Sequence, residues 1–437
     1  MIPTGRAALL LALGALCAWA FGDPWTYLAA LVVVVALLVV LDGLLAGAVG
    51  DLAFARDGAA LVRLGDSADV QLTVANTGVR PARLKLRDAW VPSAGATPFQ
   101  HETTVPAGGQ VTLVTTLRPT RRGDRPAARV TPRSYGPLGL AYRQPLGRTA
   151  QARTPAWTLR VLPRFESRKL LPEKITRLRV IDGQVAVRGR GQGTEFDSLR
   201  EYVLGDDVRS IDWRGTARRS DVVVRTWRPE RDRRVFCVLD TGRTCAARVG
   251  DEPRLEESID AALLLGALAS HTGDQVDLLA VDTAVRASVR GGSTRTVLHR
   301  LVMALAPLEP ALVETDFGLA VGEILRRQRR RALVVLFTAL EPGALGEGLL
   351  PVLSQLAARH TVVVAAVSDP ELERLAASRG GTDEVYTAAG ALRTLAERDR
   401  VKQALVRRGV TVVDAPAGQF AGRVADTYLA LKAAGKL

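Results

Sequence analysis

Two long apolar runs open the chain, and a short polar corner at Gly22-Asp23-Pro24 separates them. The runs cover about residues 7–22 and 25–45. A transmembrane helix needs roughly 20 mostly apolar residues, and ~17 still suffice. The pattern therefore predicts two membrane-spanning helices within residues 1–50, of which the first has barely the required length.

Charged and aromatic residues around these runs indicate how the helices lie in a membrane. A cleaved signal peptide is the alternative for the first run, because one basic residue precedes an apolar core that ends in small residues. We favour an uncleaved hairpin, since Trp19, Trp25 and Tyr27 stand where an aromatic belt forms. Arg6 precedes the first run and Arg56 follows the second, so the positive-inside rule places both chain ends in the cytoplasm. We expect a two-span protein of the inner or plasma membrane with most of the chain cytoplasmic.

Residues 51–165 show a different pattern, in which short runs alternate between apolar and polar positions. Examples lie at 70–74, 83–87 and 111–114, and turn residues such as Asn76-Thr77-Gly78 separate them. Alternation with period two is typical of half-buried antiparallel strands. This segment is predicted to be a β-sandwich-like domain that acts as a spacer.

Residues 233–437 alternate between short apolar runs and amphipathic helical stretches. Strands alternating with helices predict an α/β doubly wound sheet, whose ligands bind beyond the carboxyl ends of the strands. Asp240 stands at one such end. The predicted strands are 235–239, 276–281, 332–337, 361–367 and 410–413, and two clear helices are 255–270 and 316–331.

Composition narrows the classes of function. The 437 residues carry a net charge of +14, which fits contact with an anionic membrane surface or an acidic partner. No nucleic acid is expected, because base-stacking aromatics are scarce among the arginines. The basic run 326–331 is better explained as cations at a helix end, near lipid headgroups or an acidic partner. Three cysteines and four scattered histidines give neither a disulfide framework nor metal-ligand spacing, and Cys245 is read as an ordinary thiol.

A linker and a charged signature occupy residues 166–232. The glycines at 189–193 lack the lysine of a phosphate-binding loop, so nucleotide binding is disfavoured. Carboxylates in the signature lie near arginines, which favours ion-paired structural or partner-docking loops over acid–base catalysis. Trp213 is either a buried anchor or a hot spot for a partner. The expected pairs are Glu195 and Glu201 with Arg200, and Asp206 and Asp212 with Arg209.

The signature resembles that of the bacterial and archaeal family called domain of unknown function 58. Its spacing runs from a Gly-x-Gly-x-Glu-Phe start through Arg-x-Ile-Asp-Trp, and the layout of the hairpin, the β-region and the 136–140 loop fits as well. The matching residues are Gly191, Gly193, Glu195, Phe196, Leu199, Arg200, Tyr202, Gly205, Asp206, Arg209, Ile211, Asp212, Trp213, Ala217 and Arg218.

The resemblance implies a C-terminal domain similar to von Willebrand factor A domains. It also implies that the protein works with MoxR-type AAA+ ATPases, and often with a transglutaminase-like membrane protein. The implied role is to help those ATPases mature client complexes or insert metal into them. Such domains often bind Mg²⁺ through oxygen ligands. Asp240, Thr244 and Thr315 match three ligand positions, while Gly242 and Ala339 replace the other two. This degenerate set leaves weak Mg²⁺ binding and no metal as open alternatives.

We therefore expect a membrane-anchored, non-enzymatic adaptor or assembly factor. It would dock a MoxR-type ATPase, its client or both through the signature loops and the α/β domain. No catalytic residue is assigned. The alternative is a hydrolase that uses a metal at Asp240 or the signature carboxylates, for which the sequence offers neither an intact ligand set nor an unpaired acid–base pair.

Overall fold

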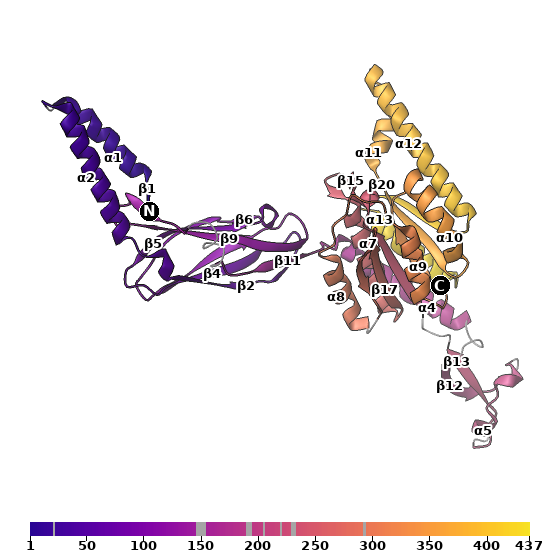
Figure 1. The fold of residues 1–437 in the computed structure, drawn as a ribbon. Helices are drawn as coiled ribbons and strands as arrows, with labels where there is room; N and C mark the ends of the chain where they lie inside the picture. Colours follow the sequence, from indigo (N-terminus) through magenta and orange to yellow (C-terminus); the bar gives the residue numbers. More distant parts are fainter. Residues whose placement is uncertain are drawn as a thin grey trace. The chain divides into compact units, whose positions relative to one another are not determined.

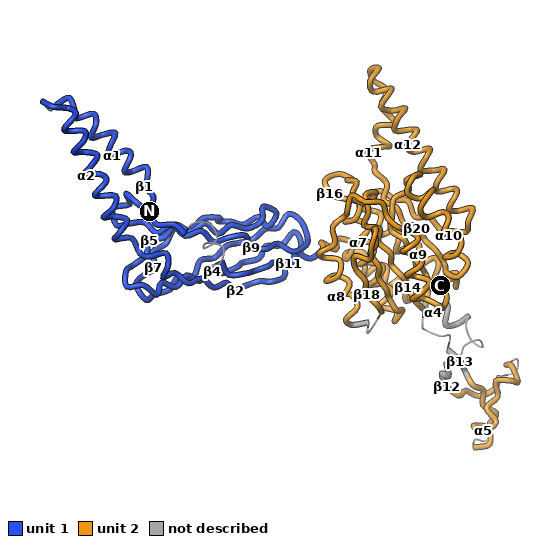
Figure 2. Tube along the Cα trace, in the orientation of Figure 1, with its two compact units in different colours: residues 1–162 blue, residues 163–437 orange. Residues whose placement is uncertain are grey.

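The computed structural model describes residues 1–20, 22–145, 154–188, 195–203, 206–218, 221–228, 233–291 and 294–437. These residues form two compact units, residues 1–162 and 163–437 (Figure 2). The four-segment division expected from the sequence is finer than this and stays a prediction.

Two apolar helices begin the first unit (Figure 1). α1 (Gly5–Leu16) continues into the short helix η1 (Cys17–Ala20), and α2 (Pro24–Leu45) follows after Asp23, whose carboxylate caps its first turn. Among the described residues, one helix is long and apolar enough to cross a membrane, the stretch Pro24–Asp51 with mean hydropathy 3.0. Gly5–Ala20 falls short of that length. The structure thus supports one candidate span near the N-terminus, and the second span stays a prediction.

The two helices pack against each other. The Tyr27 hydroxyl on α2 donates to the Gly14 carbonyl of α1 at 3.1 Å. A Cβ at Gly14 would come within 2.7 Å of the Leu31 side chain, so glycine at this position lets α2 approach closely. Ala7 and Val35 form a small buried cluster at the base of the helices together with Leu140 from the sheet-rich part.

Two sheets make up the rest of the first unit. Leu72 and Val74 of one sheet share a core with Leu84 and Leu86 of the other, because alternate residues of each strand point inward. The four-stranded sheet has the order β2 (Leu52–Gly58), β4 (Ala68–Asn76), β8 (Gln110–Leu117) and β6 (Ala96–Thr97). The seven-stranded sheet contains β1 (Ile2–Pro3), β10 (Ala141–Arg143), β9 (Gly123–Tyr135), β11 (Thr158–Leu162), β3 (Leu61–Arg63), β5 (Ala82–Trp90) and β7 (Gln100–Val105).

Arg56, which the sequence placed among the membrane-flanking charges, is buried between these sheets. Its guanidinium lies 2.5 Å from the Asp88 carboxylate, and both side chains are almost fully enclosed. Other arginines lie at the end of α2 instead. Arg80 donates to the Leu44 carbonyl at 2.6 Å, and Arg143 donates to the Gly43 carbonyl at 2.7 Å. These cations complement the negative end of the helix dipole.

Asp42 joins α2 to the loop at residues 136–141. The side chain is completely buried, and its carboxylate accepts backbone N–H bonds from Leu138, Leu140 and Ala141 at 2.7, 2.7 and 2.9 Å. A Cβ at Gly136 would collide with Asp42, which explains glycine there. The polar residue that ends the second apolar run is therefore the attachment point of the helix to the sheets.

A mixed six-stranded sheet forms the centre of the second unit. Its order is β18 (Val285–Val289), β17 (Gln275–Val281), β14 (Arg234–Asp240), β19 (Leu333–Phe337), β20 (Thr361–Ser368) and β21 (Thr411–Pro416), and all neighbours are parallel except β18 with β17. Residues 235–239 of β14 and all of β19 are apolar and buried, which fits parallel strands covered on both faces.

Helices cover both faces of this sheet. On one face, Phe236 and Val238 of β14 share a core with α9 (Phe317–Arg327) and α10 (Leu350–Ala357). On the other, Phe337 of β19 packs edge-on against Phe420 of α13, with ring centroids 6.2 Å apart. The remaining longer helices are α4 (Leu171–Arg188), α7 (Arg254–His271), α8 (Thr294–Leu305), α11 (Pro370–Ala376), α12 (Thr382–Arg407) and α13 (Phe420–Ala433). The assignment of this α/β arrangement as a von Willebrand factor A-like fold stays a prediction.

The helix predicted over 316–331 is shorter in the structure. Asp316 caps the start of α9, but the helix ends at Arg327. Gln328 adopts an extended backbone, and its buried amide donates to the Arg330 carbonyl at 3.0 Å. A buried side chain that bonds to its own neighbouring backbone thus competes with another helical turn. Arg326 and Arg327 remain in the last turn, and Arg329 to Arg331 lie beyond it.

Asp42→Ala is expected to loosen the joint between α2 and the sheets. The substitution leaves three backbone N–H groups without their acceptor, and each buried unsatisfied donor costs ~1–3 kcal/mol. Thermal unfolding of the full-length protein in detergent should show a lower midpoint, and protease should cut the 136–141 loop faster. Asp57→Ala, at an exposed position of β2, is the control and should change neither. An unchanged unfolding midpoint for Asp42→Ala would contradict the role of this carboxylate.

Candidate functional site

Two places in the second unit hold the residues singled out by the sequence. One is the Asp240 cluster, made of Asp240, Gly242, Thr244, Thr315 and Thr338. The other is the signature hairpin, made of β12 (Glu195–Glu201), β13 (Val223–Arg228) and the described residues between them.

The Asp240 carboxylate lies at the end of β14 and is only 2% exposed. One carboxylate oxygen accepts the Gly242 N–H at 2.8 Å and the Thr315 hydroxyl. The other accepts the hydroxyls of Thr244 at 2.9 Å and Thr338 at 2.6 Å. Asp240, Thr244 and Thr315 therefore come together as the sequence pattern suggested, and four donors satisfy the buried charge.

Thr338 is a member of this cluster that the sequence analysis missed. It follows β19, whose register with β14 pairs Leu239 with Phe337 and so brings the next residue beside Asp240. The ligand pattern implied by the family resemblance has an aspartate at the neighbouring position, where this chain has Ala339. A hydroxyl directly after a buried parallel strand next to β14 is the signal that would have found it.

Gly242 has a steric reason to be glycine. A Cβ at this position would collide with the Thr315 hydroxyl and would lie 2.8 Å from the Val313 carbonyl oxygen. Its backbone φ of −79° is ordinary, so the constraint is space alone. The 313–315 loop thus occupies the volume that a side chain at position 242 would need.

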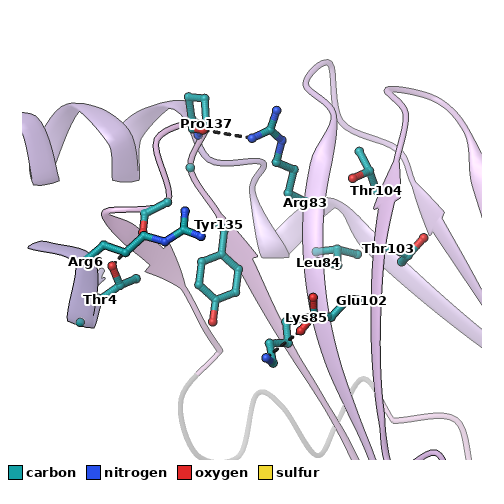
Figure 3. Close-up of a pocket in the computed structure, with 13 residues that line it drawn as sticks. Thr4, Arg6, Arg83, Leu84, Lys85, Glu102, Thr103, Thr104, Tyr135 and Pro137 are labelled. Carbon is teal, nitrogen blue, oxygen red and sulfur yellow. Dashed lines mark hydrogen bonds and ion pairs between the residues drawn. The ribbon is translucent and has the colours of Figure 1, made fainter.

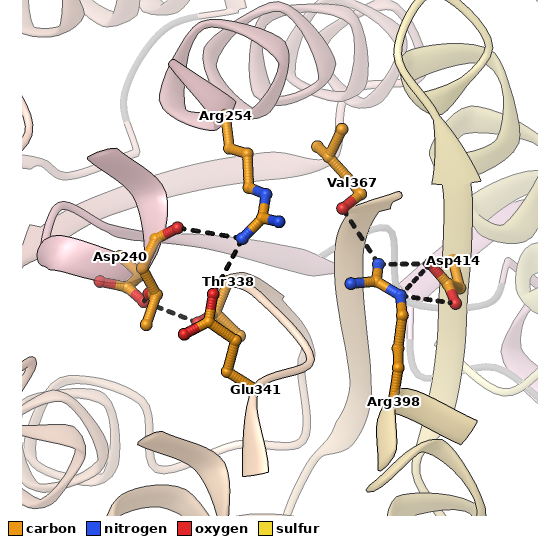
Figure 4. Close-up of polar contacts among 8 residues, drawn as sticks. Asp240, Arg254, Thr338, Glu341, Val367, Arg398 and Asp414 are labelled. Atoms are coloured by element: carbon orange, nitrogen blue, oxygen red, sulfur yellow. Dashed lines mark hydrogen bonds and ion pairs between the residues drawn. The ribbon is translucent and has the colours of Figure 1, made fainter. Parts of the chain in front are cut away.

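Charged residues around the cluster are paired with one another. Arg254 donates to the Glu341 carboxylate at 2.9 Å and to the Thr244 carbonyl at 3.3 Å (Figure 4). Arg243 is ion-paired with Glu314. Farther along the same edge, Arg398 bonds to both Asp414 and the Val367 carbonyl (Figure 4).

A divalent cation at this cluster would compete with the four hydrogen bonds that the Asp240 carboxylate accepts. One carboxylate supplies its negative charge, and all three threonine hydroxyls donate their hydrogens to that carboxylate. Mg²⁺ is usually bound through one or two carboxylates and keeps several waters. In the described part of the chain, no group of three or more His, Cys, Asp or Glu side chains is placed to hold a metal.

The cysteines nearby are not placed for nucleophilic chemistry. Burial, with the Asp240 charge as a further cause, raises the pKa of the Cys245 thiol well above its usual value. Burial also raises the pKa of Cys237 to about 12, with the Asp277 charge adding to the shift. Thiols with raised pKa values stay protonated near neutral pH, and the thiolate is the reactive form.

The signature hairpin is built on two antiparallel strands. Pairs such as Leu199 with Arg225 and Glu201 with Val223 set its register. Val223 and Val224 are buried, and a Cβ at Gly215 would lie 2.9 Å from Val223, so the short helix α5 (Trp213–Thr216) packs closely on β13. Gly191, Gly193 and Gly205 lie outside the described residues. Glu195 and Phe196 are the first two residues of β12.

The carboxylates of the hairpin bond to arginine and to backbone. Asp206 accepts the Arg200 guanidinium at 2.6 Å and the Val203 N–H at 3.0 Å. The neighbouring Arg200 guanidinium is the main cause that lowers the pKa of Asp206. Arg200 is also near Glu201, but it donates to the Glu201 backbone carbonyl.

Asp212 has two roles. One carboxylate oxygen accepts the N–H groups of Arg214 and Gly215 at 3.0 and 2.9 Å and so caps α5. The other accepts the Arg225 guanidinium at 2.8 Å, which is the main cause that lowers the pKa of Asp212. The expectation that Asp206 and Asp212 pair with Arg209 is wrong, because the strand register brings Arg225 to Asp212 and the turn after β12 brings Arg200 to Asp206.

Apolar side chains on the hairpin stand in solvent. Trp213 is 67% exposed, so it is not the buried anchor that the sequence left open. Val203 and Val208 are also largely exposed. The other signature residues support the hairpin backbone: Tyr202 pairs with Val222, Ile211 bridges to Val224, and Ala217 and Arg218 close the turn after α5.

Residues 198–405 match the family described as "Protein of unknown function DUF58". The chain is 29% identical over 183 residues to the uncharacterized proteins Mb1516 of Mycobacterium bovis and Rv1480 of Mycobacterium tuberculosis. The matched region covers 41% of this chain and 56% of each relative, so the chain spans about half the length of these curated relatives. The resemblance seen in the signature is confirmed for this domain, and the family description names no activity.

Two solved structures are only weakly similar to this chain. Escherichia coli alpha-2-macroglobulin is 15% identical with a TM-score of 0.20, covering 25% of this chain and 6% of that chain. The CARDB domain of the PF1109 protein from Pyrococcus furiosus is 16% identical with a TM-score of 0.19, covering 25% and 87%. Both TM-scores are too low to assign a shared fold.

Gly242→Ser is expected to destabilise the second unit instead of creating a metal site. The added side chain collides with the Thr315 loop, and overpacking of this kind costs ~1–3 kcal/mol. The thermal unfolding midpoint should fall, and adding MgCl₂ should not restore it. Gly322→Ser is the control, because a Cβ there meets no atom within 4 Å. A midpoint that rises with Mg²⁺ in Gly242→Ser would contradict this account.

Arg225→Gln is expected to raise the pKa of Asp212 toward 3.8, the ordinary aspartate value. A carboxylate with a lowered folded-state pKa stabilises the fold fully above its unfolded pKa, and this contribution is lost as pH falls through the folded value. The hairpin should therefore keep the Asp212 contribution at neutral pH and lose it only below about pH 3.8. A carboxyl NMR titration measures the shift. Arg214→Gln, which keeps the capping N–H, should leave the pKa in place.

Proposed function

We propose that this chain is a membrane-anchored, non-enzymatic adaptor that docks a partner protein through the signature hairpin. The single observation that carries the proposal is Trp213, an indole ring left 67% exposed beside carboxylates that are already hydrogen-bonded. Trp is among the residues that most often dominate binding energy at interfaces. An aromatic side chain held in water by a capped, ion-paired turn is suited to binding another protein.

The partner in this proposal is a MoxR-type AAA+ ATPase, its client or both. A transglutaminase-like membrane protein is a further partner in the same proposal. This choice rests on the family resemblance, and charge is compatible with it, because the exposed Arg209, Arg214 and Arg218 flank Trp213 and would favour an acidic surface. The α/β unit, proposed as von Willebrand factor A-like, carries the hairpin.

The anchor in this proposal is a two-span hairpin that stays uncleaved. β1 pairs with β10, and Thr4 bonds to the Gly139 and Leu140 carbonyls through its hydroxyl and N–H. Removing the first run would take a strand and these bonds away from the sheets. Arg6, Arg80 and Arg143 lie at the base of the helices, which supports a cytoplasmic location for the sheets under the positive-inside rule.

The rival hydrolase would need a carboxyl group with a raised pKa beside an ionised one. Asp206 and Asp212 have lowered pKa values instead, with arginine as the main cause in each. Asp240 accepts its hydrogen bonds from uncharged donors, the Gly242 N–H and three threonine hydroxyls. These observations favour the adaptor over the hydrolase.

Trp213→Ala is expected to lower recovery of the AAA+ ATPase by at least about tenfold when tagged full-length protein is captured from its native cells. Quantitative mass spectrometry with and without Mg²⁺ and ATP reads out the partner. Tyr386→Ala is the matched control, because Tyr386 on α12 is 75% exposed and should not affect capture.

Asp212→Ala, which removes the cap of α5, should reduce capture as well. Equal recovery of the ATPase by wild type and Trp213→Ala would rule out the hairpin as the docking surface. If no AAA+ ATPase is recovered under either condition, the proposed partner is wrong.

A further inference from the structure

A cavity of about 720 Å³ lies in the first unit, where the base of α1 meets the seven-stranded sheet. Figure 3 shows Arg6, Arg83 and Lys85 around it, with Tyr135 between the first and the last. Ligand pockets typically measure ~300–1,000 Å³, so this cavity has room for a small polar group. The proposed docking role of the signature hairpin does not involve this cavity.

The charge of the lining favours an anion. Three cations, Arg6, Arg83 and Lys85, face one carboxylate, Glu102, which gives a net charge of +2. Glu102 lies 2.7 Å from the Lys85 ammonium and so neutralises that member of the set. The two arginines are left as the source of the excess positive charge.

Both guanidinium groups keep unused donors. Arg83 donates one bond, to the Pro137 carbonyl at 3.0 Å, and a guanidinium carries five N–H donors. Within the described residues, Arg6 has no hydrogen-bonding or ionic partner. Its terminal nitrogen lies so close to Gly139 that a Cβ there would come within 2.7 Å, so glycine leaves room for it. Arginine forks match phosphate oxygens in pairs.

The position of the cavity points to the source of the phosphate. Arg6 is the second residue of α1 and directly precedes the apolar run, and the 136–141 loop that lines the cavity is bonded to Asp42 near the end of α2. The lining is therefore at the level where the apolar helices end, which is where the phosphates of a bilayer lie. The cytoplasmic leaflet is rich in anionic lipids.

We propose that this cavity is a binding site for the phosphodiester headgroup of an anionic phospholipid, held by Arg6 and Arg83. The inference rests on the membrane anchoring in the proposed function and does not depend on the docked partner. A lipid in this site would link the helix base, the 136–141 loop and β5 through one phosphate. The site would therefore select lipids by charge at the foot of the anchor.

Purified full-length protein in detergent tests the proposal by titration with short-chain phosphatidylglycerol, short-chain phosphatidylcholine and inorganic phosphate. Native mass spectrometry counts bound lipid. Phosphatidylglycerol should bind saturably and more tightly than the other two probes. Arg83→Gln should weaken its binding by about tenfold, the loss expected for a charge-assisted hydrogen bond.

Two further variants keep the test decisive. Arg6→Lys retains the positive charge that orients the helices but loses the paired donors, so it should weaken binding also. Arg87→Gln is the matched control, because Arg87 lies on β5, exposed, on the same sheet face as Arg83, and outside the cavity lining. It should bind phosphatidylglycerol like wild type.

The contrary outcomes are distinct. Equal losses in Arg83→Gln and Arg87→Gln would mean general surface attraction, and inorganic phosphate binding as tightly as the lipid would mean a free-anion site. Either result overturns the proposal, as does the absence of phosphatidylglycerol binding. Capture of the AAA+ ATPase should be unaffected by Arg83→Gln, so a failure of the docking proposal is recognised separately by Trp213→Ala.

Discussion

A carboxylate that leaves water must receive its hydrogen bonds from the protein, and this constraint shapes both units. An unpaired buried charge is too costly to tolerate, so each buried aspartate fixes the segments that supply its donors. Asp42 takes three backbone N–H groups from one loop, and Asp88 takes a buried arginine. Asp240 takes three hydroxyls and an N–H. Each arrangement ties together residues that are distant in sequence.

The same constraint separates a structural aspartate from a catalytic one. A general acid or base needs a carboxyl group that exchanges protons near neutral pH, which requires burial without a compensating partner. Asp206 and Asp212 are shifted in the opposite direction by arginine. The pKa values of the two hairpin carboxylates are therefore those of structural ion pairs. Trp213 is the largest of the exposed apolar side chains that the structure describes on the hairpin.

Much of the fold follows from apolar patterns, since these depend on neighbours within a few residues. The predicted strand 235–239 is β14 within one residue at each end, and the helix predicted from residue 316 is α9, which buries Phe317, Ala320, Val321 and Ile324. Side-chain partners on neighbouring strands could not be predicted from these patterns. Arg225 reaches Asp212 through the register of the hairpin, and Thr338 reaches Asp240 through the register of β19 with β14. Sequence proximity favoured Arg209, and the ligand spacing implied by the family resemblance favoured Ala339. Neither contains information on strand register.

The joint at Asp42 shows how one polar residue determines the position of an apolar helix. A charged side chain at the centre of a bilayer costs ~2.5–3.5 kcal/mol on insertion scales, so Asp42 cannot be drawn into the hydrocarbon without a penalty. Nor can it move outward freely, because its three N–H donors belong to a loop that β10 and the Thr4 bonds hold in place. The carboxylate therefore sets the depth at which α2 ends and the sheets begin. Arg6 at the start of α1 is the second polar residue at this helix base, and in the proposed lipid site it would bind the membrane surface.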